Sequence, residues 1–285
     1  MTNALIISRD AFAAAHPEQR VALNGREWGV IEIGDSGPAL LLSPGTLGRA
    51  DIFWQQMNAL KGRAHILSVS YPDSGGVDEW ASDLMALISD RGIEKITVLG
   101  SSLGGYLAQY IAAVHPERVE RLIAANTLYN TAPAKQSPPY SSDLDLAPIE
   151  ELRAGFGRGL GVWADSHPEQ AEVVDLLLQE VGGRIPEPEL RSRLKGIKNA
   201  PVLLTNGVSA ANTVTIEGAD DPLIPPFMRD EVRAALNPAV SYRFESGGHF
   251  PYLVRPELYT AILEEQLQLV PAGSTEWGNA EERAR

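Results

Sequence analysis

The chain has 285 residues, 44% of them hydrophobic, which is enough for one large α/β sheet to bury a sizeable core. Its net charge of -13 disfavours binding to nucleic acid or anionic membranes, and the absence of cysteine excludes disulfides, thiolate catalysis and cysteine-ligated metals. No apolar stretch approaches the ~20 residues that span a bilayer, and residues 1–10 do not read as a signal peptide. We therefore expect a cytoplasmic protein.

Short apolar runs alternate with amphipathic segments in the first half of the chain, a pattern typical of a parallel sheet flanked by helices. Helical periodicity is present over Val77–Asp90 and in the segment that follows Ser102. The predicted strands of this region are Val21–Leu23, Trp28–Ile33, Ala39–Ser43, His65–Ser70, Ile96–Leu99 and Leu122–Ala125.

The alternation stops after Asn126, where a segment rich in proline and serine begins. Helical stretches separated by glycine and proline follow at Ile149–Phe156, Glu169–Val181 and Glu189–Leu194. Residues 132–200 are therefore interpreted as a helical cap, whose apolar side chains could line a pocket or pack onto the core. These side chains are Phe156, Leu160, Val162, Trp163, Leu176 and Leu177.

Strand signals return after the cap at Thr213–Glu217 and Ser241–Phe244, and a last helix is predicted over about Pro256–Leu269. Pro201–Thr205 also has the composition of a strand, and the sequence does not decide between it and Thr213–Glu217. The prediction is a mostly parallel eight-stranded sheet with helices on both faces. The α/β domain that contains this sheet is predicted to comprise residues 20–131 and 201–270. Residues 1–19 and 271–285 are expected to be flexible termini.

The pentapeptide Gly100-Ser101-Ser102-Leu103-Gly104 has the G-x-S-x-G pattern of a nucleophile elbow. It follows a predicted strand and opens a predicted helix, which is the context that this motif requires. The glycines allow a tight turn and close approach of strand and helix. Ser102 is the candidate nucleophile, because Ser101 lies in strand register and is expected to point away.

A serine hydroxyl needs a base, and His249 is the candidate because it lies between a strand and the final helix, in Gly247-Gly248-His249-Phe250-Pro251. The other histidines precede prolines, open a strand or end a helix. The acid that orients this base is expected in the loop after a strand, at Asp220 or Asp221. The order Ser, Asp, His along the chain is that of an α/β fold with this elbow.

Two backbone N–H groups are needed to stabilise a developing oxyanion. One is expected from Leu103, the residue after the nucleophile. The other is expected from the loop Ser43-Pro44-Gly45-Thr46, where Thr46 is favoured over Leu47. No metal ligand set and no organic cofactor is predicted.

These features resemble the α/β-hydrolase superfamily over about residues 20–270, and the maspardin-like group in particular. The resemblance favours Asp221 over Asp220, because of its spacing to Pro225, and implies an α/β-hydrolase fold. One departure is Tyr71-Pro72-Asp73, which replaces the usual Asp-x-x-Gly turn. The matching stretches are Ser43-Pro44-Gly45-Thr46, Ala50-Asp51-Ile52-Phe53, Tyr71-Pro72, Gly104-Gly105-Tyr106-Leu107-Ala108-Gln109 and Gly247-Gly248-His249-Phe250-Pro251-Tyr252-Leu253.

The resemblance implies a serine hydrolase that cleaves a carboxylic ester, thioester or lactone of a small organic molecule through an acyl-enzyme. Two alternatives stay open: a C–C bond hydrolase, and a maspardin-type adaptor with a vestigial triad. Animal maspardins carry asparagine at the position of His249, whereas this chain retains the histidine. The expected partner is a small-molecule substrate, with no nucleic acid and no membrane. The sequence allows a homodimer but does not determine the oligomeric state.

Overall fold

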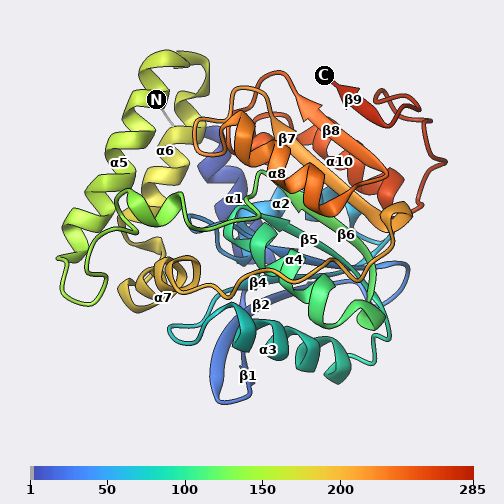
Figure 1. Ribbon diagram of the computed structural model, residues 1–285, viewed down its shortest axis with the longest axis horizontal. Helices are drawn as coiled ribbons and strands as arrows, with labels where there is room; N and C mark the ends of the chain where they lie inside the picture. Colours follow the sequence, from blue (N-terminus) through green and yellow to red (C-terminus); the bar gives the residue numbers. More distant parts are fainter. Residues whose placement is uncertain (1–2) are drawn as a thin grey trace.

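The computed structural model describes residues 3–285, in which nine strands form one mixed sheet (Figure 1). The strand order is β1-β2-β4-β3-β5-β6-β7-β8-β9. The pairs β1–β2 and β2–β4 are antiparallel, and every later pair is parallel. The strands are β1 (Gln19–Leu23), β2 (Arg26–Ile33), β3 (Ala39–Ser43), β4 (His65–Ser70), β5 (Ile96–Ser101), β6 (Val119–Ala125), β7 (Thr213–Gly218), β8 (Val240–Phe244) and β9 (Glu282–Ala284).

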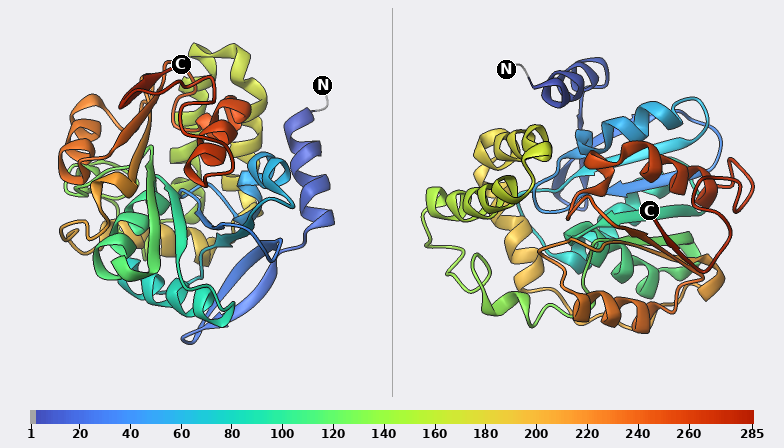
Figure 2. Two further views of the ribbon diagram at one scale, coloured as in Figure 1. Left: turned by 90° about the vertical axis from the view of Figure 1, so that its right-hand side faces the viewer. Right: turned by 90° about the horizontal axis from the view of Figure 1, so that it is seen from above.

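Helices cover both faces of the sheet, as predicted (Figure 2). One face packs against α1, α2 and α10, and the other against α3, α4 and α8. Leu41 points to the second group while Leu40 and Leu42 point to the first, so the apolar run of β3 fills both layers. The helices are α1 (Ala4–Ala15), α2 (Trp54–Leu60), α3 (Val77–Asp90), α4 (Leu103–Val114), α5 (Ile149–Ser166), α6 (Ala171–Gln179), α7 (Glu187–Lys198), α8 (Pro226–Leu236), α9 (Pro251–Val254) and α10 (Pro256–Gln266).

Helices α5, α6 and α7 occupy the region predicted as a cap and lie together at one end of the molecule (Figure 1). The ambiguity over the strand that follows them is resolved in favour of β7. Pro201–Thr205 forms no strand, because Val202 and Leu204 point to solvent with 85% and 59% of their surface exposed.

The N-terminal segment does not match the expectation of a flexible terminus over residues 1–19. Residues Ala4–Ala15 form helix α1, whose Arg9 is buried and donates a hydrogen bond to Glu180 in the cap. Phe12, on the same helix, packs into the hydrophobic core. The buried ion pair between Arg9 and Glu180 and the packing of Phe12 anchor this helix, and no local sequence motif predicts either contact.

The C-terminal segment differs from the prediction in the same way, and it supplies the ninth strand where eight were predicted. Strand β9 pairs in parallel with β8. Arg283 of β9 is buried, forms an ion pair with Glu265 and lies over the ring of Tyr242, 5.1 Å from its centroid. A polar tail is therefore ordered by contacts that are distant in the chain, so flexibility over residues 271–285 is wrong for this strand.

Candidate active site

The G-x-S-x-G segment forms a sharp turn between β5 and α4. Ser102 has φ 55° and ψ -116°, a left-handed conformation that non-glycine residues rarely adopt. A Cβ atom on Gly104 would lie 2.0 Å from the carbonyl oxygen of Ser43, and one on Gly100 would lie 1.9 Å from that of Gly104. The Ser102 N–H donates to the carbonyl of Ala125 at 2.9 Å. The motif glycines are therefore required by close backbone packing around the serine.

His249 and Asp221 form a buried pair, with 2.8 Å between His249 Nδ1 and Asp221 Oδ2. The other oxygen of Asp221 accepts from the backbone N–H groups of Leu223 and Ile224, at 2.8 and 3.1 Å. Burial by itself would raise the pKa of Asp221. The charge of His249, with hydrogen bonds from His249, Asn126 and Leu223, holds this pKa below its usual range. The carboxylate is therefore ionised and oriented toward the ring.

Asp220 has a different set of contacts from its neighbour. Its two carboxylate oxygens accept from the backbone N–H groups of Gly247 and Gly248, at 3.0 and 2.9 Å. The structure thus brings Asp221 to the ring of His249, while Asp220 holds the glycine loop that leads into it.

Asn126 is a further residue of the candidate site, and no motif in the sequence predicted it. It directly follows β6 and has φ 42°, and its Nδ2 donates to Asp221 Oδ2 at 3.0 Å and to the carbonyl of Gly248 at 3.3 Å. The only signal was an asparagine directly after an apolar strand, since asparagine tolerates a left-handed backbone better than most residues. Asn126 links the acid and the histidine loop to the end of a core strand.

The loop after β3 lies against Ser102. A Cβ atom on Gly45 would come within 3.1 Å of Ser102 Cβ, so only a small residue allows this approach. Within residues 3–285, neither the Thr46 N–H nor the Leu103 N–H donates to a protein acceptor. Both amides are therefore free to donate to a bound molecule.

In the described part of the chain, the Ser102 hydroxyl and the His249 ring are not hydrogen bonded to each other. The ring nitrogen that forms a hydrogen bond is Nδ1, and its partner is Asp221. In serine and cysteine enzymes such contacts are often long before substrate binds and shorten in the complex. Ser102 is partly exposed, whereas His249 is 5% exposed. A substrate therefore has access to the serine from solvent.

The cap covers the histidine loop through Trp163 of α5. Gly248 has φ 56°, and a Cβ atom there would lie 2.7 Å from the Trp163 ring. Trp163 also packs 6.0 Å from the ring centroid of Phe250. Among the other cap side chains proposed to line a pocket, Leu176 and Leu177 are fully buried in the core, and Val162 is 69% exposed and points to solvent.

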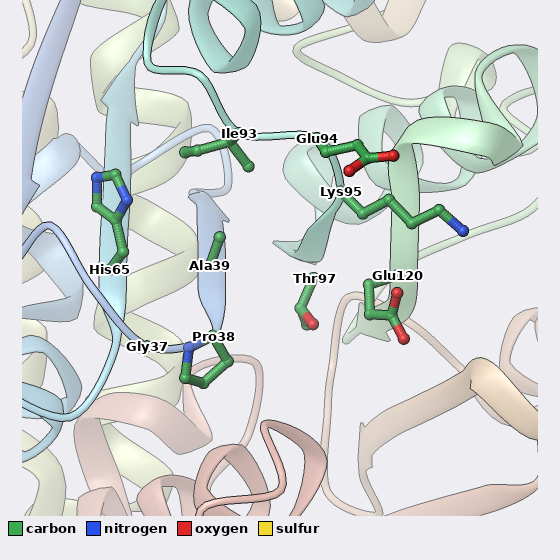
Figure 3. Close-up of a pocket in the computed structure, with 9 residues that line it drawn as sticks. All are labelled: Gly37, Pro38, Ala39, His65, Ile93, Glu94, Lys95, Thr97 and Glu120. Carbon is green, nitrogen blue, oxygen red and sulfur yellow. The ribbon is translucent and has the colours of Figure 1, made fainter.

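Figure 3 shows the residues that line a surface depression of about 480 Å³, and none of them belongs to this cluster. Its walls come from the amino ends of the parallel strands, whereas Ser102 and His249 follow the carboxyl ends of β5 and β8. Ligands of open α/β sheets bind at the carboxyl ends, so the depression is not the candidate active site. Its lining residues are Gly37, Pro38, Ala39, His65, Ile93, Glu94, Lys95, Thr97 and Glu120.

In residues 3–285, no group of three or more histidine or acidic side chains could hold a metal ion. In the same part of the chain, no helix is both long and apolar enough to cross a membrane.

Comparisons with known proteins agree with the fold. A family model described as alpha/beta hydrolase fold matches residues 38–256. Maspardin from Danio rerio is 24% identical over 256 residues, covering 86% of this chain and 80% of the maspardin. The pimeloyl-(acyl-carrier protein) methyl ester esterase of Nitrosomonas europaea is 24% identical over 245 residues, covering 82% of this chain and 97% of the esterase. Among solved structures, the enol-lactonase from Burkholderia xenovorans LB400 superposes with a TM-score of 0.72 at 18% identity, over 88% of this chain and 100% of the lactonase.

Proposed function

The chain belongs to the α/β-hydrolase-fold family and is similar to maspardins, and on this premise we propose that it is a serine hydrolase of ester-like bonds in small organic molecules. The buried contact between Asp221 and His249 is the observation that supports this most directly. A protein that only binds a partner has no need for an ionised carboxylate aligned with an imidazole nitrogen next to a strained serine.

In the proposed mechanism, His249 takes the proton of the Ser102 hydroxyl as the hydroxyl attacks the acyl carbon of the substrate. Asp221 keeps the ring in the correct tautomer and stabilises the imidazolium that forms. The N–H groups of Leu103 and Thr46 stabilise the oxyanion of the tetrahedral intermediate. The intermediate collapses as the His249 imidazolium donates its proton to the oxygen of the departing alcohol, which leaves the acyl group on Ser102. Water then attacks this acyl-enzyme with His249 again as the base, and the acid product leaves as His249 returns the proton to the Ser102 oxygen.

An ester-like bond is favoured over other acyl bonds by two of the similar proteins. One is a methyl ester esterase and the other an enol-lactonase, and both names describe cleavage of an ester linkage. The fold itself does not determine the leaving group, so the acyl and alcohol portions of the substrate are left to experiment.

The similarity to maspardin supports a second function, that of an adaptor whose triad is vestigial. The two functions differ in the reactivity of Ser102. A fluorophosphonate probe should label the wild-type protein and fail to label Ser102→Ala, because the reaction requires an activated serine hydroxyl.

The decisive experiment is hydrolysis of acyl esters of graded chain length by the wild type, Ser102→Ala and Ser101→Ala. Removal of the nucleophile should lower kcat by about three orders of magnitude or more. Ser101 is the matched control, because it is buried in β5 one residue away. A wild-type protein that neither reacts with the probe nor hydrolyses any ester, or a Ser102→Ala variant with full activity, would contradict the hydrolase function.

A further inference from the structure

Arg193 of α7 is a fully buried cation whose hydrogen bonds converge on the loop that carries Thr46. Its side chain has no exposed surface. Its Nη1 donates to the carbonyl of Thr46 at 3.0 Å and to the carbonyl of Gly48 at 2.6 Å. A residue of the cap region thus contacts the backbone of the loop that is proposed to bind the oxyanion.

The buried charge is compensated within this cluster. Glu189, one turn earlier on α7, has an oxygen 3.4 Å from Arg193 Nη2. The guanidinium carbon lies 5.4 Å from the centroid of the Tyr71 ring, in a cation–π arrangement. Burial lowers the pKa of Arg193 to about 10, so the side chain is still a cation at neutral pH. The arginine therefore acts as a charged hydrogen-bond donor.

Tyr71 holds the same loop from a second direction. Its buried hydroxyl donates to the carbonyl of Pro44 at 2.8 Å. Tyr71 belongs to the Tyr71-Pro72-Asp73 turn that departs from the usual family pattern. Its side chain therefore has a structural use in this protein, as both a donor to the loop and a surface for Arg193.

These contacts determine where the loop amides point. A peptide unit is planar and trans, so its C=O and its N–H point in opposite directions. The carbonyls of Pro44 and Thr46 are bonded to Tyr71 and Arg193, and the carbonyl of Gly45 between them accepts from the Gly48 N–H at 3.1 Å. Three successive peptide units are thus held by their oxygens, and the middle unit contains the Thr46 N–H.

Helix α7 is itself fixed to the core, so it can act as a rigid support. A Cβ atom on Gly196 would lie 2.3 Å from the ring of Trp80 on α3, which means that the two helices touch at this glycine. Arg193 is three residues earlier on the same helix. The loop after β3 is therefore positioned by a helix that is packed against α3.

We propose that Arg193, together with Tyr71, positions the Thr46 N–H for oxyanion stabilisation and is a positioning residue for catalysis. The inference rests on the proposed hydrolase function. Because Arg193 is fully buried it does not contact substrate, and it acts only through the backbone of the Pro44–Gly48 loop.

The test compares Arg193→Met with Arg191→Met on the ester that the wild type hydrolyses fastest. Arg191 is the matched control: it also lies on α7 and donates to two carbonyls, those of Leu144 and Ala147, at 2.8 and 2.9 Å. Those carbonyls lie outside the Pro44–Gly48 loop. Any general effect of removing an arginine from α7 therefore appears in both variants.

Removing one oxyanion donor costs about 100- to 1,000-fold in kcat, so loosening one should cost about 10- to 100-fold. Arg193→Met should lower kcat by that factor with KM changed by less than about threefold, because only the transition state uses the donor. The affinity for a trifluoromethyl ketone, which forms an oxyanion adduct with the serine, should fall in parallel with kcat. The affinity for the corresponding methyl ketone should not change. Arg191→Met should leave all four quantities within about threefold.

Equal kcat values for the two arginine variants would overturn the inference while leaving the hydrolase function intact. Parallel loss of affinity for both ketones would also overturn it, since that result indicates general damage to the site. Tyr71→Phe serves if Arg193→Met does not fold, because it removes only the hydroxyl and keeps the ring. It should lower kcat about 3- to 10-fold, the effect of one lost hydrogen bond, and an unchanged kcat would contradict the inference. An inert wild type would overturn both proposals.

Discussion

Replacing Asp221 by asparagine removes a charge from a carboxylate whose two oxygens are both in use. Oδ1 accepts from the N–H groups of Leu223 and Ile224, and Oδ2 accepts from His249 and Asn126. An asparagine has one acceptor oxygen and one amide donor. If its oxygen stays with the two backbone groups, its NH₂ group faces two other donors.

That arrangement changes the protonation of the ring. His249 can accept from the new NH₂ group only if Nδ1 has lost its proton, which places the proton on Nε2. Nε2 is the nitrogen that has to accept the proton of Ser102. In a serine protease triad the corresponding substitution lowers kcat about 10⁴-fold, and we expect a similar factor here. A factor of 10⁴ corresponds to about 5.5 kcal/mol of transition-state stabilisation.

Asp220→Asn is the matched control in the adjacent position. Its single oxygen can still accept from Gly247 or Gly248, so one hydrogen bond is lost and kcat should fall by about tenfold or less. The assay is steady-state hydrolysis of the preferred ester by both variants, with far-ultraviolet circular dichroism to verify folding. A loss of less than tenfold in Asp221→Asn, or a larger loss in Asp220→Asn, would refute the assignment of Asp221 as the acid.

Three further predictions concern the surroundings of this pair. Asn126→Ala should lower kcat by up to about tenfold, the effect of one lost hydrogen bond to the carboxylate, and unchanged kinetics would contradict a positioning role. Because the folded-state pKa of Asp221 is lowered, its contribution to the free energy of unfolding is complete above the ordinary value of 3.8 and is lost as the pH falls through the lower folded value. The difference between wild type and Asp221→Asn in denaturant titrations should therefore stay constant while the pH is above about 4 and shrink as the pH falls below 3.8, and a difference that does not change below 3.8 would disprove it. Gly104→Ala should destabilise the fold by about 2 kcal/mol or more because its Cβ would lie 2.0 Å from the Ser43 carbonyl, whereas Gly159→Ala, with no neighbour within 4 Å, should stabilise α5 by about 0.5–1 kcal/mol. Thermal unfolding of both variants tests this contrast.

The sequence by itself determined most strands of the sheet and the position of the candidate nucleophile in the chain. A short, continuous apolar run such as Ala39–Ser43 predicts a strand that is buried on both faces, and β3 has the same bounds. The elbow at Ser102 is equally local. Glycines on either side of it are required by contacts within a few residues or with the adjacent strand.

Only the tertiary structure decided which groups meet around that serine. Asp220 and Asp221 are the same residue type and are adjacent in the chain, so the sequence does not distinguish them. The orientation of the loop after β7 directs Asp220 to the N–H groups of Gly247 and Gly248 and Asp221 to His249. Arg193 reaches Thr46 across 147 residues of chain. Such contacts are single hydrogen bonds between distant segments, so they produce no periodicity in the sequence and no local motif. The same reason explains why α1 and β9, each tied to the molecule by a buried arginine, were predicted as flexible termini.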